Sequence, residues 1–167
     1  MNQQKTIPFV LTAYSLPHVM GYLPTKAGEA HPSPLSTIGL MDTARELGLA
    51  GVEIPLTRRV PSFDGKLVEV GSADTDIRAA LAERGLKLVA DYGNILDQDA
   101  QHLKDYLKLA AQTGAKVVRA TLSHLLCGDR RKLEGGWEAR MEALAARLRE
   151  VLPAAEDLGV CLAVENH

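Results

Sequence analysis

Residues 158–167 read LGVCLAVENH, and they decide which fold the rest of the chain supports. Gly159 ends a helical pattern. The short apolar run from Val160 to Val164 contains two valines, as expected for a buried strand. The run leads directly into the three polar residues 165–167. Because α/β proteins place their chemistry at the carboxyl ends of such strands, the stretch predicts a strand that ends at a functional site.

The same unit of amphipathic helix, glycine and strand occurs at three earlier places. The matching stretches are LGLAGVE at 47–53, RGLKLV at 84–89 and TGAKVV at 113–118. Strands that alternate with helices predict parallel strands joined by right-handed crossovers. The connections after strands are long and those after helices are short, which favours a (β/α)₈ barrel with its function on the strand-end face. A doubly wound open sheet fits less well, because no Gly-x-Gly-x-x-Gly phosphate turn is present.

Five strands and four helices account for the sequence, which is about half of the barrel pattern. We therefore expect an α/β fold in which residues 1–167 form a single domain, a partial TIM barrel and its N-terminal half. Ser33 and Pro34 predict the start of the first helix. The Asp-Gly pair at 64–65 predicts a small hairpin after the second strand. The expected strands cover 9–15, 52–56, 87–92, 116–122 and 160–164. The later helices are expected to begin near 73, at Asp97 or Asp99, and near 137.

Composition sets limits on function. Hydrophobic residues make up 46% and charged residues 24% of the chain, as in globular proteins. A net charge of −2 gives no basic face for nucleic acid and no polybasic segment for a membrane. Cys127 and Cys161 lack metal-ligand spacing, and Cys161 is expected as a small buried hydrophobe. A reduced, cytoplasmic protein is the resulting expectation.

Three stretches carry a resemblance to a known family. GLAGVE at 48–53, GAKVVR at 114–119 and LAVENH at 162–167 resemble the N-terminal part of xylose-isomerase-like sugar isomerase and epimerase barrels. That group also contains inosose dehydratases, hydroxypyruvate isomerases and endonuclease IV. In it the first glutamate binds a divalent metal and serves in proton transfer, so the resemblance implies that Glu165 is both metal ligand and catalytic residue. The other ligands (an Asp, a His and a second Glu) belong to strands six to eight of such barrels.

A sugar isomerase needs a base near the C–H bond and an electrophile at the neighbouring oxygen. A divalent ion supplies the electrophile. Oxygen ligands favour Mg²⁺ or Mn²⁺, and an added histidine leaves Zn²⁺, Co²⁺ or Fe²⁺ open. The implied partner is a sugar or sugar phosphate.

Further candidates lie where strands are predicted to end. Glu53 and Arg119 occupy strand positions that can face the barrel interior, where they either contact substrate or form a buried ion pair. The residues predicted to contact substrate are His18, Tyr22, Glu53, Arg119, His124 and His167. Three residues at the end of the third predicted strand have two possible roles, which are contact with a substrate hydroxyl or a solvated position in a loop. They are Asp91, Tyr92 and Asn94. Arg58 and Arg59 suit a phosphate or a solvated surface, and Trp137 is expected in the core.

The first hypothesis is therefore a metal-dependent isomerase or epimerase of a sugar or sugar phosphate. A lyase that dehydrates an inosose or dehydroshikimate is the alternative within the same fold. Endonuclease IV fits worse, because it has histidines where this chain has Thr57-Arg58 and Tyr92-Gly93-Asn94. A third hypothesis is a non-catalytic half barrel that forms a homodimer through its open strand edges.

Overall fold

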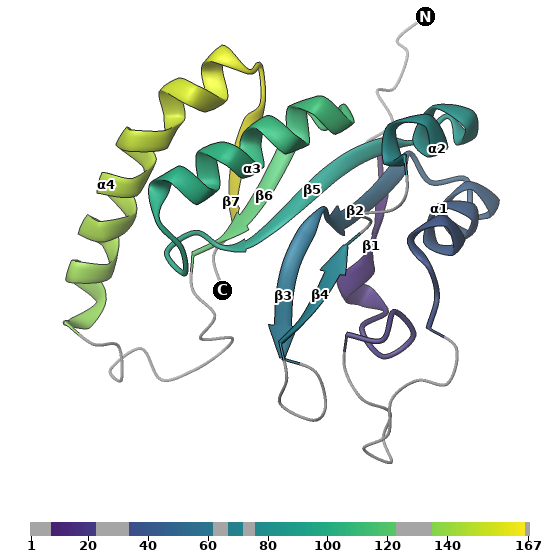
Figure 1. Cartoon of the computed structure of the whole chain (residues 1–167), viewed down its shortest axis with the longest axis horizontal. Helices are drawn as coiled ribbons and strands as arrows, with labels where there is room; N and C mark the ends of the chain where they lie inside the picture. The colour runs from purple at the N-terminus through teal and green to yellow at the C-terminus, as the bar shows by residue number, and fades with distance from the viewer. Residues whose placement is uncertain (1–7, 23–33, 62–66, 72–75, 123–134, 166–167) are drawn as a thin grey trace, which may run out of the picture. The chain divides into compact units, whose positions relative to one another are not determined.

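The computed structural model describes residues 8–22, 34–61, 67–71, 76–122 and 135–165 (Figure 1). The chain forms two compact units, Met1–Leu88 and Val89–His167. Five parallel strands form one sheet in the order β1-β2-β5-β6-β7. Their bounds are Val10–Thr12 (β1), Gly51–Pro55 (β2), Lys87–Asn94 (β5), Val117–Thr121 (β6) and Cys161–Glu165 (β7). The predicted parallel α/β fold is confirmed.

The helices follow the strands as the repeat predicted. They are α1 (Thr37–Glu46), α2 (Ile77–Arg84), α3 (Ala100–Thr113) and α4 (Gly136–Asp157). A short 3₁₀ turn, Ala13–Ser15, follows β1. The glycine that precedes each repeat strand has a positive φ, namely Gly48, Gly85, Gly114 and Gly159. In that conformation a glycine ends a helix without steric cost.

An antiparallel ribbon follows β2 in the first unit. Its strands are β3 (Thr57–Pro61) and β4 (Leu67–Gly71), and Pro61 lies opposite Leu67. The predicted hairpin is therefore confirmed, although the Asp-Gly pair itself lies outside the described residues.

The core of the first unit lies between β2 and α1. Val52, Ile54 and Leu56 are almost fully buried, as their shared face predicted. Leu40, Met41 and Ala44 of α1 are fully buried. Position 51 requires glycine because two backbone segments approach each other closely there. A Cβ at this position would lie 2.2 Å from the carbonyl oxygen of Lys87.

Helix α1 begins later than Ser33 and Pro34 predict. Ser36 is the N-cap, and its Oγ accepts a hydrogen bond of 3.0 Å from the amide of Gly39. The sequence offers two serines three positions apart, and Ser36 is the nearer of the two to the buried apolar stripe. Leu47, placed on that stripe by its spacing, is instead 64% exposed at the C-cap.

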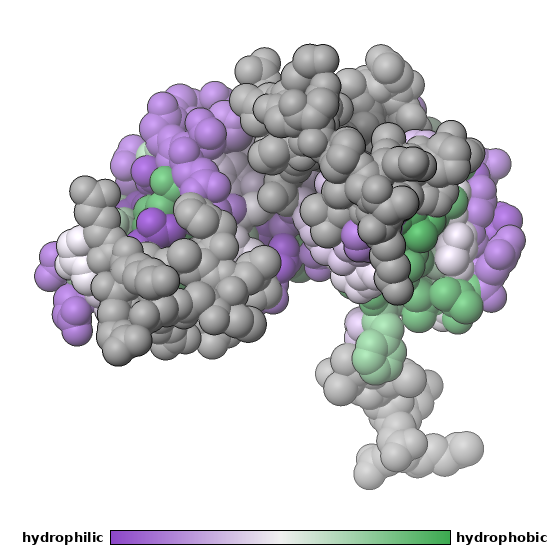
Figure 2. Space-filling model, turned by 90° about the horizontal axis from the view of Figure 1, so that it is seen from below, coloured by the Kyte–Doolittle hydropathy of each residue, from purple (hydrophilic) through white to green (hydrophobic). Residues whose placement is uncertain are grey.

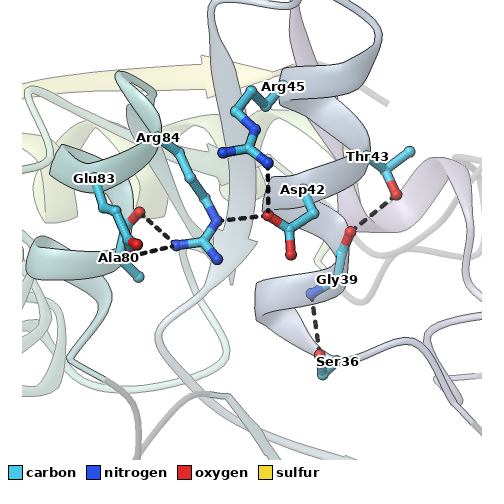
Figure 3. A network of polar contacts seen from close by, with 8 residues as sticks. All are labelled: Ser36, Gly39, Asp42, Thr43, Arg45, Ala80, Glu83 and Arg84. Carbon is cyan, nitrogen blue, oxygen red and sulfur yellow. Dashed lines mark hydrogen bonds and ion pairs between the residues drawn. The ribbon is translucent and has the colours of Figure 1, made fainter.

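Polar side chains join α1 to α2 (Figure 3). Arg84 Nε donates a 2.8 Å hydrogen bond to Asp42 Oδ1, and Arg84 Nη1 donates to the carbonyl oxygen of Ala80 at 3.1 Å. The Arg84 hydrogen bond lowers the pKa of Asp42 below its ordinary value of 3.8. Arg45 and Glu83 join the same network at its exposed rim.

The second unit packs α3 against α4, and α4 against β7 (Figure 1). Asp99 caps α3 by accepting from the amide of His102 at 2.8 Å, so Asp99 rather than Asp97 is the cap. The predicted stripe of α3 is confirmed, since its members are all buried: Leu103, Tyr106, Leu107 and Ala110.

Helix α4 differs from its prediction. It runs past Pro153 as expected, but the residues it buries are Val151 and Ala155. Trp137, expected in the core, is half-buried, and Leu152 is 40% exposed. The apolar spacing locates the inner face of a helix but does not tell how much of that face a neighbour covers.

Cys161 is exposed, which corrects the expected buried position. It lies on β7, an outer strand in the order of the sheet, where an apolar run need not be covered on both faces. Val164 on the same strand is 41% exposed. Figure 2 shows hydrophobic residues at the surface beside hydrophilic ones. Among the described residues, no helix is long and apolar enough to cross a bilayer.

Candidate functional site

Three charged side chains meet across three neighbouring strands of the second unit. Arg119 on β6 donates from Nη1 to Asp91 Oδ1 on β5 at 2.7 Å. Arg119 also contacts Glu165 Oε2 on β7 through Nε and Nη2. We call Asp91, Arg119 and Glu165 the strand-end triad. The exposed fraction of the side chain rises from 0% at Asp91 to 19% at Arg119 and 41% at Glu165.

The sheet register explains why these side chains meet. Asp91 lies opposite Arg119, and Glu165 lies opposite Thr121, one strand further along and two positions nearer the carboxyl end. Residues two apart share a face of a strand. Arg119 therefore reaches sideways to a buried carboxylate and forward to a more exposed one. The predicted extended segment beside the fourth strand is confirmed as β7.

A β-bulge shapes the end of β5. The register shifts between Asp91 and Gly93, so Tyr92 is the extra residue. Gly93 has a φ of 87°, and its amide donates to Asp91 Oδ1 at 3.3 Å. The bulge thus gives Asp91 a backbone donor in addition to Arg119. Bulges of this kind often re-aim side chains beside functional sites.

Tyr92 points to helix α3. Its Oη lies 3.1 Å from Nδ1 of His102, and its ring meets that of Tyr106 edge-on at 5.2 Å. Tyr106 Oη donates to the carbonyl oxygen of Asp91 at 2.6 Å. Burial raises the pKa of Tyr92 to about 12. Tyr92 therefore serves packing, which neither the substrate-contact nor the solvated-loop reading anticipated.

Asn94 closes β5 and is buried, with 7% of its surface exposed. Its Oδ1 accepts from the amide of Leu96 at 3.1 Å and from Arg140 Nη2 at 3.4 Å. Arg140 Nη2 also donates to the carbonyl oxygen of Leu122 at 3.4 Å. The amide of Leu122 in turn donates to the carbonyl oxygen of Glu165 at 2.9 Å. Asn94 is thus a buried hydrogen-bonding group rather than a solvated one.

Two arginines of α4 were missed by the sequence reasoning. Arg140 and Arg147 are two turns apart and share one face of the helix. Arg147 Nη1 donates to the carbonyl oxygen of Ile95 at 3.0 Å and also contacts the carbonyl oxygen of Gln98. Their spacing of seven residues was the available signal, since it places two cations on the face that also carries Met141 and Leu144.

The first unit contains three of the predicted substrate contacts. Glu53 is half-buried, and its Oε1 accepts from Thr12 Oγ1 at 3.2 Å. Tyr22 is half-buried, with its ring centroid 5.6 Å from that of Tyr14. His18 is exposed. Each lies after or within the first two strands of this unit, as predicted.

The remaining predicted residues lie outside what the structure describes. His124, Asn166 and His167 are not among the described residues, and nor are the side chains of Arg58 and Arg59. Among the residues that are described, no group of three His, Cys, Asp or Glu side chains is placed to hold a metal ion. Glu165 offers one carboxylate, whose oxygen chemistry suits Mg²⁺ or Mn²⁺. The described residues thus supply one ligand, Glu165, of the metal site that the resemblance implies.

A family model described as "Xylose isomerase-like TIM barrel" matches residues 41–167, which include β2, β5, β6, β7 and Glu165. The chain belongs to the xylose isomerase-like TIM barrel family. The resemblance carried by GLAGVE, GAKVVR and LAVENH is therefore confirmed. Comparison with curated proteins finds no match.

One solved structure supports the fold, and a second is less similar. A D-psicose 3-epimerase with D-tagatose from Clostridium cellulolyticum H10 is similar, with a TM-score of 0.54 and 18% identity over 75% of this chain and 45% of that chain. An uncharacterised protein from Parabacteroides distasonis ATCC 8503 matches with a TM-score of 0.47 and 16% identity, covering 80% of this chain and 48% of that chain. The chain thus spans less than half the length of both structures.

Proposed function

We propose that this member of the xylose isomerase-like family takes part in the metal-dependent isomerisation or epimerisation of a sugar or sugar phosphate. The observation that carries the proposal is the position of Glu165, a half-exposed carboxylate at the carboxyl end of the parallel strand β7, held by Arg119. Strand ends of this kind carry the active sites of TIM barrels. The similar fold of a D-psicose 3-epimerase supports the same reaction class.

Glu165 is the residue that we assign to proton transfer and to metal binding. Isomerisation and epimerisation both remove a proton from a carbon next to a carbonyl, which requires a base within hydrogen-bonding reach of that proton. Arg119 contacts one oxygen of the carboxylate, Oε2, through two nitrogens, which holds that oxygen in place. Asp91 in turn fixes Arg119. The strand-end triad therefore orients the base before substrate arrives, which lowers the cost of positioning it.

A bound divalent ion (Mn²⁺, Mg²⁺, Zn²⁺ or Co²⁺) would polarise the substrate oxygens. Glu165 is the described residue that would hold it. His18, Tyr22, Glu53, Arg119, His124 and His167 remain our proposed substrate contacts. The dehydratase alternative uses the same groups and differs in its product.

Deuterium exchange tests the proposed reaction. The protein is incubated in D₂O with Mn²⁺ and D-psicose, D-tagatose or their phosphates, and NMR records deuterium at the carbon next to the carbonyl. We expect exchange in the wild type and in Glu156→Gln, an exposed change on α4, and its loss in Glu165→Gln. Loss of water from the sugar without exchange would favour the dehydratase. If neither exchange nor loss of water occurs with any of these sugars, the proposal is contradicted.

A second proposal concerns assembly, and its partner is another copy of this chain. β1 and β7 are the outer strands in the order of the sheet, and both carry exposed apolar side chains. Val10 of β1 is 36% exposed and Val164 of β7 is 41% exposed. Exposed apolar strand edges favour pairing. Light scattering should find a dimer in the wild type that Val164→Lys weakens, and a monomer at all concentrations would contradict this.

A further inference from the structure

Among the described residues, Arg140 has no anionic partner, and it lies at the end of the sheet where the proposed site lies. Figure 1 shows that α4 begins on the lower side of the view, toward which β6 and β7 point. Arg140 lies in the second turn of this helix, and its side chain reaches Asn94 and Leu122 at the ends of β5 and β6. Leu122 is bonded through its amide to the carbonyl oxygen of Glu165. Arg140 is thus two hydrogen bonds away from the backbone of Glu165.

The hydrogen bonding of Arg140 is weak. Both of its bonds come from Nη2, both are 3.4 Å long, and both end on neutral oxygens. Its Nε is buried and has no hydrogen-bond partner. A guanidinium has five N–H donors in a planar fork, and buried donors are normally satisfied. Arg140 therefore has unused donors, which a ligand with several acceptor oxygens can meet.

Other arginines of the described chain are satisfied differently. Arg84 and Arg119 each contact two carboxylates. Arg147, on the same face of α4 as Arg140, donates to two backbone carbonyl oxygens, one of them at 3.0 Å. Long bonds through one nitrogen and an unpartnered Nε thus distinguish Arg140 from these three.

We propose that Arg140 binds an oxyanion of the substrate, either a phosphate ester or a carboxylate, beside Glu165. The proposal rests on the proposed sugar chemistry and narrows it to anionic sugars. Because Nε is buried, the side chain of Arg140 must turn for an oxyanion to meet its Nε–Nη2 edge, and the oxyanion then forms two charge-assisted hydrogen bonds in place of two long neutral ones. Arginine is the residue best suited to such two-point recognition of phosphate or carboxylate.

The first turn of α4 contributes less to this site. Its N-cap, Gly135, makes no side-chain cap bond, so amides of the first turn face the same end of the helix. The turn also carries the exposed carboxylate of Glu138, which opposes an anion. The assignment therefore rests on Arg140. It also follows that Glu138→Gln should strengthen anion binding.

The test follows the Nε–H resonances of the arginines by NMR during titration with inorganic phosphate, with acetate, and with chloride at matched ionic strength. Without metal, phosphate should move the Arg140 Nε–H signal saturably and leave those of Arg147 and the exposed Arg149 in place. A response to phosphate alone indicates a phosphorylated sugar. A response to phosphate and acetate extends the site to sugar acids. Equal, non-saturating shifts at all three arginines overturn the proposal.

Variants separate binding from structure. Arg140→Gln should abolish the saturable phosphate effect on the melting temperature, whereas Arg147→Gln should lower the melting temperature in buffer and keep that effect. If both variants keep it, Arg140 does not bind the anion. Should Arg140→Gln fail to fold, the wild-type Nε–H titration still decides. No step of this test involves Mn²⁺. A negative result therefore does not affect the assignment of Glu165 as a metal ligand, and a negative result in the metal titration does not affect the assignment of Arg140.

Discussion

Two arginine clusters of this protein use the same chemistry in different places. Arg84 joins two helices through Asp42, a carboxylate whose side chain is 37% exposed (Figure 3). Arg119 joins three strands through Asp91, which is fully buried, and Glu165, which is half-exposed. The first cluster lies on the surface of helices. The second lies at the strand ends, where a family member has its site.

The contrast teaches that an ion pair signals function through its position and burial and not through its composition. A pair on helix surfaces adds little to stability and is screened by salt. A buried carboxylate with a fixed guanidinium is costly to disturb and holds its neighbours in one geometry. At the strand-end triad the element held in place is Glu165, the proposed base.

The largest effect is expected from removing Arg119. Arg119→Gln leaves the fully buried Asp91 without its cation, and the loss of one partner of a buried pair costs about 3–5 kcal/mol in the free energy of unfolding. Urea denaturation measures the loss. The double variant Asp91→Asn/Arg119→Gln should recover part of it, because no uncompensated charge then remains. If Arg119→Gln and the wild type are equally stable, the strand-end triad contributes no more to stability than the surface pair Asp42–Arg84.

A smaller effect is expected at alkaline pH. Burial raises the pKa of Tyr92 to about 12, whereas unfolded tyrosine titrates near 10. Between these values the unfolded chain has already lost the proton that the folded chain keeps, so Tyr92 makes stability fall as pH rises from about 10 to about 12. Tyr92→Phe should show a shallower fall in melting temperature across that window. Superimposable curves would exclude the contribution.

The smallest effect is expected in the helix-surface network. The Arg84 hydrogen bond lowers the pKa of Asp42, so the stability from this pair is present above the ordinary value of 3.8 and is lost as pH falls through the lower folded pKa. Asp42→Asn should remove that acid dependence and change the melting temperature at pH 7 far less than Arg119→Gln does. A loss as large as that of Arg119→Gln would remove the distinction between the two clusters.

Much of this architecture could be predicted from local signals. Gly48, Gly85, Gly114 and Gly159 end helices because a left-handed residue is cheap only for glycine, and this requirement is written in the sequence. The same regularity predicted the parallel strands, and three short stretches carried the resemblance to the family. The choice of Ser36 over Ser33 as the cap was not fixed locally, because both serines suit that role.

The details of the site depended on contacts between distant segments. Asp91, Arg119 and Glu165 were each singled out, but their contact requires the register of β5, β6 and β7. Tyr92 packs against α3 because of a β-bulge that no sequence pattern predicted. Arg140 was not among the predicted site residues, and only its contacts at the ends of β5 and β6 show that it donates to neutral oxygens there. The exposure of Cys161 likewise depends on the place of β7 in the sheet.

Titration with Mn²⁺, followed by electron paramagnetic resonance, tests the role of Glu165 most directly. The matched proteins are the wild type, Glu165→Gln, and Glu156→Gln, in which an exposed glutamate of α4 is changed. We predict saturable binding to the wild type and to Glu156→Gln, and a Kd at least about tenfold higher for Glu165→Gln. The same Kd for all three proteins would contradict the assignment of Glu165 as a metal ligand.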